Sequence, residues 1–155
     1  MDIEQIYHRQ VDTVYRVAMM YLKNRPDAED MTQQAFINLM NKPVAFESES
    51  HERAWLIVTV SNLCKNQLSH WYKKKRTDFE DVAPLLSSED PQTDHVLEQV
   101  LNLPNEYKTI IYMYYYEGYS TREISQYLEL NESTLRSRMQ KARELLKLEL
   151  EEVHE

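Results

Sequence analysis

The sequence predicts an all-α protein made of two small helical domains joined by a flexible acidic linker. Three observations support this prediction. The 155-residue chain has one glycine, Gly118, and five prolines, whereas sheets joined by hairpins usually place glycines in their tight turns. Hydrophobic residues form 42% of the chain and recur at helical spacing. Residues 77–99 hold seven Asp or Glu and no Lys or Arg, which indicates a linker between two folded parts.

The first domain, residues 1–76, is expected to begin with two helices. Apolar residues repeat every three or four positions over about 3–23, which predicts an amphipathic helix. Asn24 then provides an N-cap for a second helix, with Pro26 in its first turn. This helix is expected to stop near Pro43, because proline cannot continue a helix interior.

A polar loop at about 44–50 precedes the third expected helix. That helix runs from about Glu52 to Arg76, a stretch that contains neither glycine nor proline. Residues 77–92 then read as the linker, since they are acidic and include two prolines and paired serines.

The second domain, residues 93–155, is expected to open with a short helix through 96–101. Pro104 starts a further helix, and Gly118 follows it where a helix C-terminus favours a left-handed residue. The sequence of Ser120 to Glu123 matches a capping box, which predicts another helix start.

A turn at 129–131 follows that helix and leads into a longer one, expected from Glu132 to about Glu149 with Asn131 as its cap. A short capped helix, a three-residue turn and a helix with a polar first half have the layout of a helix-turn-helix. In such units the second helix enters the major groove of DNA. The pattern fits an ordinary helical hairpin with a charged solvent-facing side equally well.

The expected third helix ends in two aromatic residues followed by four cations, from Trp71 to Arg76. Aromatic rings stack on unpaired bases and cations follow the phosphate backbone, so this end suits single-stranded DNA. The alternative is that Trp71 is buried and the cations complement the dipole of a helix C-terminus.

The net charge of −8 argues at first against nucleic acid as a partner. Residues 1–76, however, carry a net charge of +2, residues 100–155 carry −3, and the rest lies mostly in the linker. Phosphate binding depends on the charge of the local face and not on the total.

No catalytic, metal or cofactor site is expected. The lone Cys64 excludes an internal disulfide and a multi-cysteine zinc site. The acids of 27–30 fit the first turn of a helix as surface charges, and one glycine cannot build a phosphate-binding loop.

No segment is long and apolar enough for a membrane helix and the start lacks a signal pattern, so a cytoplasmic protein is expected. The tyrosines at 112–119 are open to two readings, core packing or a protein-binding patch.

Several short motifs occur in a characteristic order. They are Asp27-Ala28-Glu29-Asp30-Met31-Thr32-Gln33-Gln34-Ala35-Phe36, Arg53-Ala54-Trp55-Leu56, Asn62-Leu63, Leu103-Pro104-Asn105-Glu106-Tyr107, Tyr116-Glu117-Gly118-Tyr119-Ser120, Glu123-Ile124 and Ser133-Thr134-Leu135-Arg136-Ser137-Arg138. Their order and spacing resemble the two conserved domains of extracytoplasmic-function sigma factors, the group IV members of the sigma-70 family of bacterial RNA polymerase sigma factors. The resemblance covers about residues 3–76 and 95–148.

The resemblance implies a non-enzymatic protein that binds core RNA polymerase, recognises promoter elements and assists promoter melting. It implies contacts with the clamp coiled coil of the largest polymerase subunit and with the flap, an acidic linker near the RNA path, and restraint by an anti-sigma factor. The implied clamp contacts are Asp27, Asp30, Gln33 and Gln34. The implied contacts with the minus-ten element are Phe46, Glu47, Ser48, His51, Asn62, Lys65, Asn66, Trp71, Tyr72, Lys73, Lys74 and Arg76. Those with the minus-thirty-five element are Ser120, Thr121, Glu132, Ser133, Thr134, Arg136, Ser137, Arg138, Lys141 and Arg143.

The chain departs from the family pattern at two positions. Gln34 stands where the family commonly has an acid, and Glu129 stands where it commonly has a glycine. A left-handed conformation at Glu129 would cost roughly 1 kcal/mol.

Two rival functions remain open from the sequence. A freestanding helix-turn-helix regulator would bind its specific duplex without polymerase. A sigma-like interaction protein would not bind DNA at all, so its activity would survive replacement of the cations at 73–76 by alanine.

Overall fold

The computed structural model describes residues 2–42, 44–77 and 103–153. Every regular element in these residues is a helix, as the sequence predicts. They form two compact units, one on either side of the segment 78–102. The expected helix at 96–101 and all of the expected linker except Thr77 lie outside the described residues.

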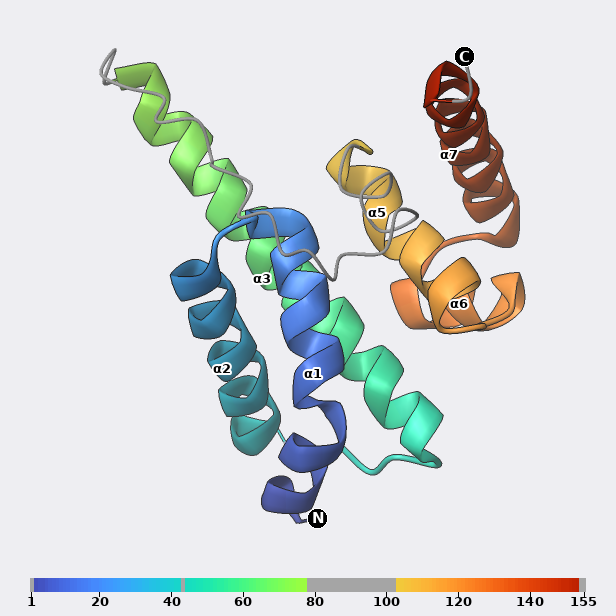
Figure 1. The fold of residues 1–155 in the computed structure, drawn as a ribbon. Helices are drawn as coiled ribbons and strands as arrows, with labels where there is room; N and C mark the ends of the chain where they lie inside the picture. Colours follow the sequence, from blue (N-terminus) through green and yellow to red (C-terminus); the bar gives the residue numbers. More distant parts are fainter. Residues whose placement is uncertain (1, 43, 78–102, 154–155) are drawn as a thin grey trace. The chain divides into compact units, whose positions relative to one another are not determined.

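The first unit consists of three helices packed side by side (Figure 1). Their bounds are α1 Ile3–Leu22, α2 Arg25–Asn41 and α3 Glu49–Thr77. The last turns of α3 extend beyond the ends of α1 and α2, so this end of the helix stands apart from the bundle (Figure 1).

Local caps explain where α1 and α2 begin and end. The Asp2 carboxylate accepts hydrogen bonds from the backbone N–H groups of Glu4 and Gln5, at 3.1 and 3.3 Å. Lys23 closes α1 in a left-handed conformation, with φ of 57°. Asn24 then caps α2, accepting from the Asp27 N–H at 3.0 Å, which confirms the predicted start of this helix.

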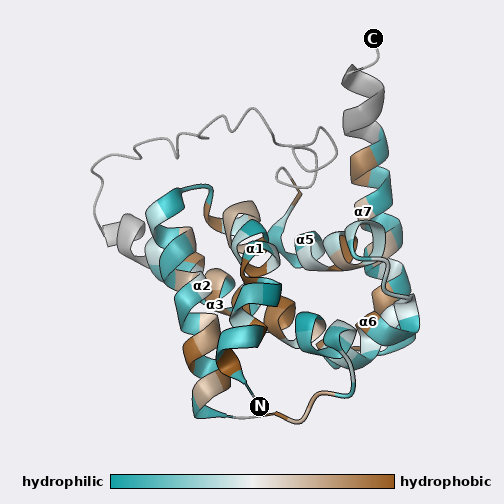
Figure 2. Cartoon of the chain, turned by 60° about the horizontal axis from the view of Figure 1, so that its bottom comes forward, coloured by the Kyte–Doolittle hydropathy of each residue, from teal (hydrophilic) through white to brown (hydrophobic). Residues whose placement is uncertain are grey.

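The core of the first unit is apolar and comes from all three helices. Each of the three helices carries both hydrophilic and hydrophobic residues (Figure 2). The hydrophobic side of each helix packs against the other two helices. The most deeply buried side chains are Val14, Val17, Ala18, Leu22, Ala28, Ala35, Leu39, Ala54, Leu56, Ile57, Val60 and Cys64.

The start of α3 differs from the sequence prediction, because the helix begins at Glu49 and not near Glu52. Ser48 acts as an N-cap: its hydroxyl accepts from the His51 N–H at 3.0 Å. The His51 ring caps the same helix start, since its Nδ1 accepts a hydrogen bond from the Glu47 N–H at 3.2 Å. Two backbone donors are thus satisfied at the helix start, and the preceding loop is shorter than predicted.

The second unit contains α5 Asn105–Ile111, the π-helical turn η1 Tyr112–Tyr116, α6 Thr121–Leu128 and α7 Glu132–Val153. The π turn was not predicted. In a π turn each N–H bonds to the carbonyl five residues earlier, and here the Glu117 N–H donates to the Tyr112 carbonyl at 3.2 Å. Gly118 follows with φ of +78°, which confirms its predicted role as a helix stop.

The helix-turn-helix geometry is present in α6 and α7. Ser120 and Glu123 form both halves of the predicted capping box. Glu129 ends α6 with φ of 55°, so the non-glycine residue does adopt the left-handed conformation. Helix α7 begins directly after Asn131 and continues four residues past the predicted end at Glu149. Leu135, Met139 and Ala142 bury its inner side.

Glu129→Gly is expected to raise the free energy of unfolding of the second unit by about 0.5–1 kcal/mol. Glycine adopts a left-handed conformation without steric strain, and relief of that strain exceeds the added entropy of the unfolded chain. Thermal unfolding followed by circular dichroism measures the change. Gln140→Gly, at an exposed position inside α7, is the control and should destabilise by about 1 kcal/mol. Equal destabilisation by both variants would contradict the prediction.

Candidate nucleic-acid and polymerase interfaces

The exposed side of α2 carries two of the four predicted polymerase contacts. Asp30 and Gln33 are exposed, but Gln34 is half-buried and its Nε2 donates to the Asn38 side chain at 2.9 Å. Asp27 is hydrogen-bonded to the amide of its own helix cap, Asn24.

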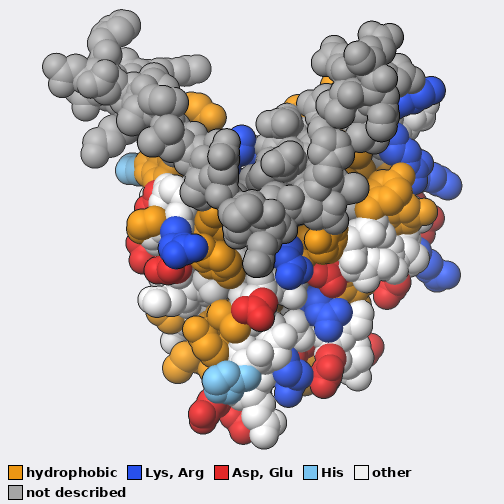
Figure 3. All heavy atoms as spheres, viewed as in Figure 1, with side chains coloured by type: hydrophobic (Ala, Val, Ile, Leu, Met, Phe, Trp, Pro, Cys, Tyr) orange, Lys and Arg blue, Asp and Glu red, His pale blue; other side chains and the backbone are white. Residues whose placement is uncertain are grey.

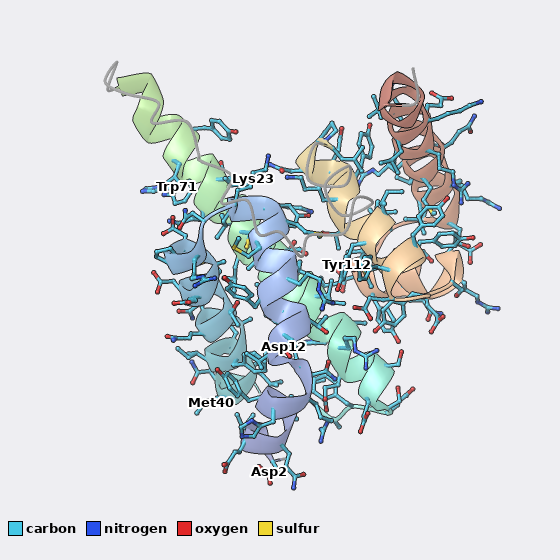
Figure 4. The ribbon with its side chains drawn as sticks, in the orientation of Figure 1. Asp2, Asp12, Lys23, Met40, Trp71 and Tyr112 are labelled. Carbon is cyan, nitrogen blue, oxygen red and sulfur yellow. The ribbon has the colours of Figure 1, made fainter. Side chains whose placement is uncertain are left out.

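Two apolar residues missed by the sequence reasoning extend this exposed side. Ile37 is 44% exposed and Met40, at the end of α2 in Figure 4, is 59% exposed. They lie seven and ten positions after Asp30, which places all of them on the same side of the helix. That spacing was visible in the sequence, but Ile37 and Met40 were indistinguishable there from core residues. We call Asp30, Gln33, Ile37 and Met40 the α2 face.

The loop before α3 is held against that helix by an aromatic cluster. The half-buried Phe46 ring lies edge-to-face with His51 at 5.3 Å and with Trp55 at 6.1 Å between centroids. Ser48 and His51 are both engaged in the helix cap, whereas the side chain of Glu47 is exposed. Four of the predicted minus-ten residues are thus brought together by this loop and the first turn of α3.

A partly buried polar network joins α1 to the first two turns of α3, next to this loop. The Arg9 guanidinium donates from Nε and Nη2 to the two carboxylate oxygens of Glu52, at 3.2 and 3.0 Å. Gln10 Nε2 donates to Glu52 at 3.0 Å, and the Gln10 oxygen accepts from Arg53 at 3.2 Å. The hydrogen bond to Glu52 raises the pKa of the Arg9 guanidinium. No local pattern predicts this network, because its partners lie about 43 positions apart.

The predicted contacts along α3 lie mainly on one side of the helix. Asn62 and Asn66 are exposed, and the Lys65 ammonium lies 6.0 Å from the centroid of the Tyr21 ring. Trp71 is half-buried near the end of α3 (Figure 4), and Tyr72 is 61% exposed. Lys73, Lys74 and Arg76 occupy the final helical turns, and their side chains lie outside the part of the chain that the structure describes.

The outer side of α7 presents most of the predicted duplex contacts to solvent. Figure 3 shows Lys and Arg side chains gathered along this helix. Thr134 and Arg138 are half-buried, as is Thr121, and the Ser120 hydroxyl is engaged in the capping box. The exposed members of the predicted set on α7 are Glu132, Ser133, Arg136, Ser137, Lys141 and Arg143. Gln140 and Lys147 are also exposed on α7 and were not predicted.

Arg143 has a specific partner that the sequence did not reveal. Its Nε donates to the Tyr115 hydroxyl at 2.7 Å. Its guanidinium carbon also lies 5.5 and 5.8 Å from the ring centroids of Tyr114 and Tyr115. The tyrosines therefore divide between core and surface, since Tyr112 is buried and Tyr115 is 53% exposed.

Within the described residues, no group of three or more His, Cys, Asp or Glu side chains is placed to hold a metal ion. No helix in the described segments has the length and apolarity that a membrane crossing requires.

Comparison with known proteins identifies both units. The family model for sigma-70 region 2 matches residues 6–77, and that for sigma-70 region 4 matches residues 94–146. A three-helix unit followed by a helix-turn-helix unit in one short chain is the architecture of a small sigma factor. The chain belongs to the sigma-70 family of RNA polymerase sigma factors and, within it, to the extracytoplasmic-function group. Sigma factors are transcription initiation factors and not conventional enzymes.

The curated relatives cover nearly the whole chain. The RNA polymerase sigma factor SigV of Bacillus subtilis is 28% identical over 143 residues, which are 88% of this chain and 83% of SigV. The extracytoplasmic-function sigma factor SigW of the same organism is 25% identical over 173 aligned positions, covering 98% of this chain and 89% of SigW. The fold matches the sigma factor RpoE of Bartonella quintana, solved with the anti-sigma factor NepR, with a TM-score of 0.73, 21% identity and 96% of each chain covered.

Proposed function

We propose that this sigma factor divides promoter recognition between its two units. The first unit binds core polymerase and the melted minus-ten strand, and the second reads the minus-thirty-five duplex. The observation that carries the proposal is the exposed polar and cationic side of α7, which begins at the turn of a helix-turn-helix. Such a helix reaches bases with its first residues and phosphates with later ones.

The α2 face is the proposed contact with the clamp coiled coil of the largest polymerase subunit. It combines an acidic and an amide side chain with two exposed apolar residues, a mixture that suits a protein interface. Gln34 and Asp27 contribute less directly, because their side chains are bonded within α2 and its cap. The flap contact is proposed for the second unit by family resemblance.

The melted minus-ten strand is proposed to lie along α3 and the loop before it. The Phe46 cluster offers aromatic surface next to the exposed Glu47. Asn62, Asn66 and Tyr72 continue along the helix, and the final cations follow. Stacking on a ring contributes roughly 1–3 kcal/mol per base, which favours the unpaired strand.

An anti-sigma factor is a proposed partner in the cytoplasm, where polymerase and its promoters are found. The Bartonella quintana relative was solved in complex with such a protein. The α2 face supports this proposal, since an inhibitor that covers it would exclude core polymerase. The proposed mechanism contains no chemical step catalysed by the chain itself.

Transcription in vitro with core polymerase and a library of promoter sequences tests the proposal. The full chain is expected to select a subset of promoters with a shared minus-ten and minus-thirty-five pattern, because each unit reads one element. A library transcribed no better than by core polymerase alone would overturn the proposal. Selection of the same duplexes by the chain without polymerase would instead establish a freestanding regulator.

A further inference from the structure

The π turn separates its tyrosines into two groups. Tyr112 is buried, and its hydroxyl donates to the Glu117 carboxylate at 2.8 Å (labelled in Figure 4). The Tyr116 ring stacks on Tyr112, with 5.2 Å between centroids. Tyr114 and Tyr115 instead turn toward α7 and contact Arg143.

The structure of the free protein fixes the Nε of Arg143 and leaves its two Nη atoms available for a ligand. The Nε donor is bonded to the Tyr115 hydroxyl, and the rings of Tyr114 and Tyr115 both lie beside the guanidinium group. An arginine has four further N–H donors on its two Nη atoms. Among the described residues, the structure shows no hydrogen bond from these Nη donors of Arg143. Two parallel donors in a fixed plane match a phosphate group.

Arg143 lies at the point of α7 where the helix would leave the DNA groove and pass the phosphate backbone. It lies seven residues after Arg136, which is about 10 Å along the helix axis. The major groove is about 12 Å wide. When the first two turns of α7 contact base edges, Arg143 therefore reaches the backbone that borders the groove.

From these observations we infer that Tyr115 is a positioning residue, which holds Arg143 ready for a backbone phosphate of the duplex bound by α7. This inference rests on the proposed reading of duplex DNA by the second unit. An exposed arginine normally loses rotamer freedom when it binds. Here the tyrosines restrict that freedom before binding, so the phosphate contact forms with a smaller loss of entropy.

The test uses the full chain assembled with core polymerase. The probe is a fluorescein-labelled duplex with the upstream element of a promoter recovered from the transcription library, and binding is measured by anisotropy at several KCl concentrations. Arg143→Gln should weaken binding and lower the salt slope by about 0.9, the value of one phosphate contact. Tyr115→Phe, which removes only the hydroxyl, should weaken binding about fivefold with the slope unchanged.

Two comparisons separate positioning from a structural role. In the Arg143→Gln background, Tyr115→Phe should cause no further loss, because the tyrosine acts through Arg143. Tyr116→Phe is the matched control in the same turn and should bind as the unmodified protein does, and all variants should keep its unfolding temperature. Unchanged binding by Tyr115→Phe, or an equal loss in both backgrounds, would overturn the inference. A library that yields no promoter would overturn the proposed function, and this inference with it.

Discussion

Replacing Glu52 with alanine is expected to lower the free energy of unfolding of the first unit by about 2 kcal/mol. The Glu52 carboxylate is buried and accepts three hydrogen bonds, two from Arg9 and one from Gln10. Loss of the carboxylate leaves the buried Gln10 amide without its acceptor, which is destabilising. Arg9 loses its partner too, but its side chain is 36% exposed, so water solvates part of its charge. Hydrogen exchange of amides in α1–α3 measures the effect separately from the second unit.

Glu49→Ala is the matched control for this prediction. Glu49 also lies near Arg9, but at 3.7 Å and with 68% of its side chain exposed. An exposed ion pair of this kind contributes roughly 0–1 kcal/mol. If the two variants lower the free energy of unfolding equally, burial of Glu52 does not explain how much its hydrogen bonds stabilise the first unit. An unfolding free energy unchanged by Glu52→Ala would contradict the prediction.

Arg136→Ala is expected to weaken binding of the minus-thirty-five duplex by about 1–3 kcal/mol, or roughly 10- to 100-fold. Arg136 is exposed one turn into α7, where a recognition helix contacts base edges. A base-reading arginine carries specificity, so the variant should also discriminate less between upstream sequences. Competition binding of polymerase holoenzyme to duplexes with single base changes measures both effects.

Lys147→Ala provides the comparison on the same helix. Lys147 is exposed eleven residues further along α7, beyond the stretch that fits within the groove. Its loss should weaken every duplex by a similar small factor and leave discrimination unchanged. A loss of discrimination with Lys147→Ala, or none with Arg136→Ala, would show that α7 enters DNA in another register.

The sequence predicted those features of the fold that depend on neighbouring residues. Asn24, Gly118 and the Ser120–Glu123 pair mark helix ends through bonds that span at most a few positions. The cap at Ser48 has the same local nature, yet it was overlooked because it lies in a run of polar residues. The π turn was missed because a stretch rich in tyrosine has no clear apolar period.

The candidate site was predictable only in outline. Family motifs pointed to α2, the loop, α3 and α7, but not to which side chains are available there. Gln34 and Asp27 are bonded locally, whereas Ile37 and Met40 are exposed. The contacts of Glu52 with Arg9 and of Tyr115 with Arg143 join residues 43 and 28 positions apart. Such pairs depend on tertiary packing, which no local pattern encodes.

The buried Cys64 gives the protein a natural reporter of its own opening. It is the single cysteine of the chain, and its side chain is fully enclosed by the first unit. A thiol reagent can modify it only when that unit opens. The rate of modification therefore follows the opening of the first unit alone, without an introduced label, in the free protein and in its complexes.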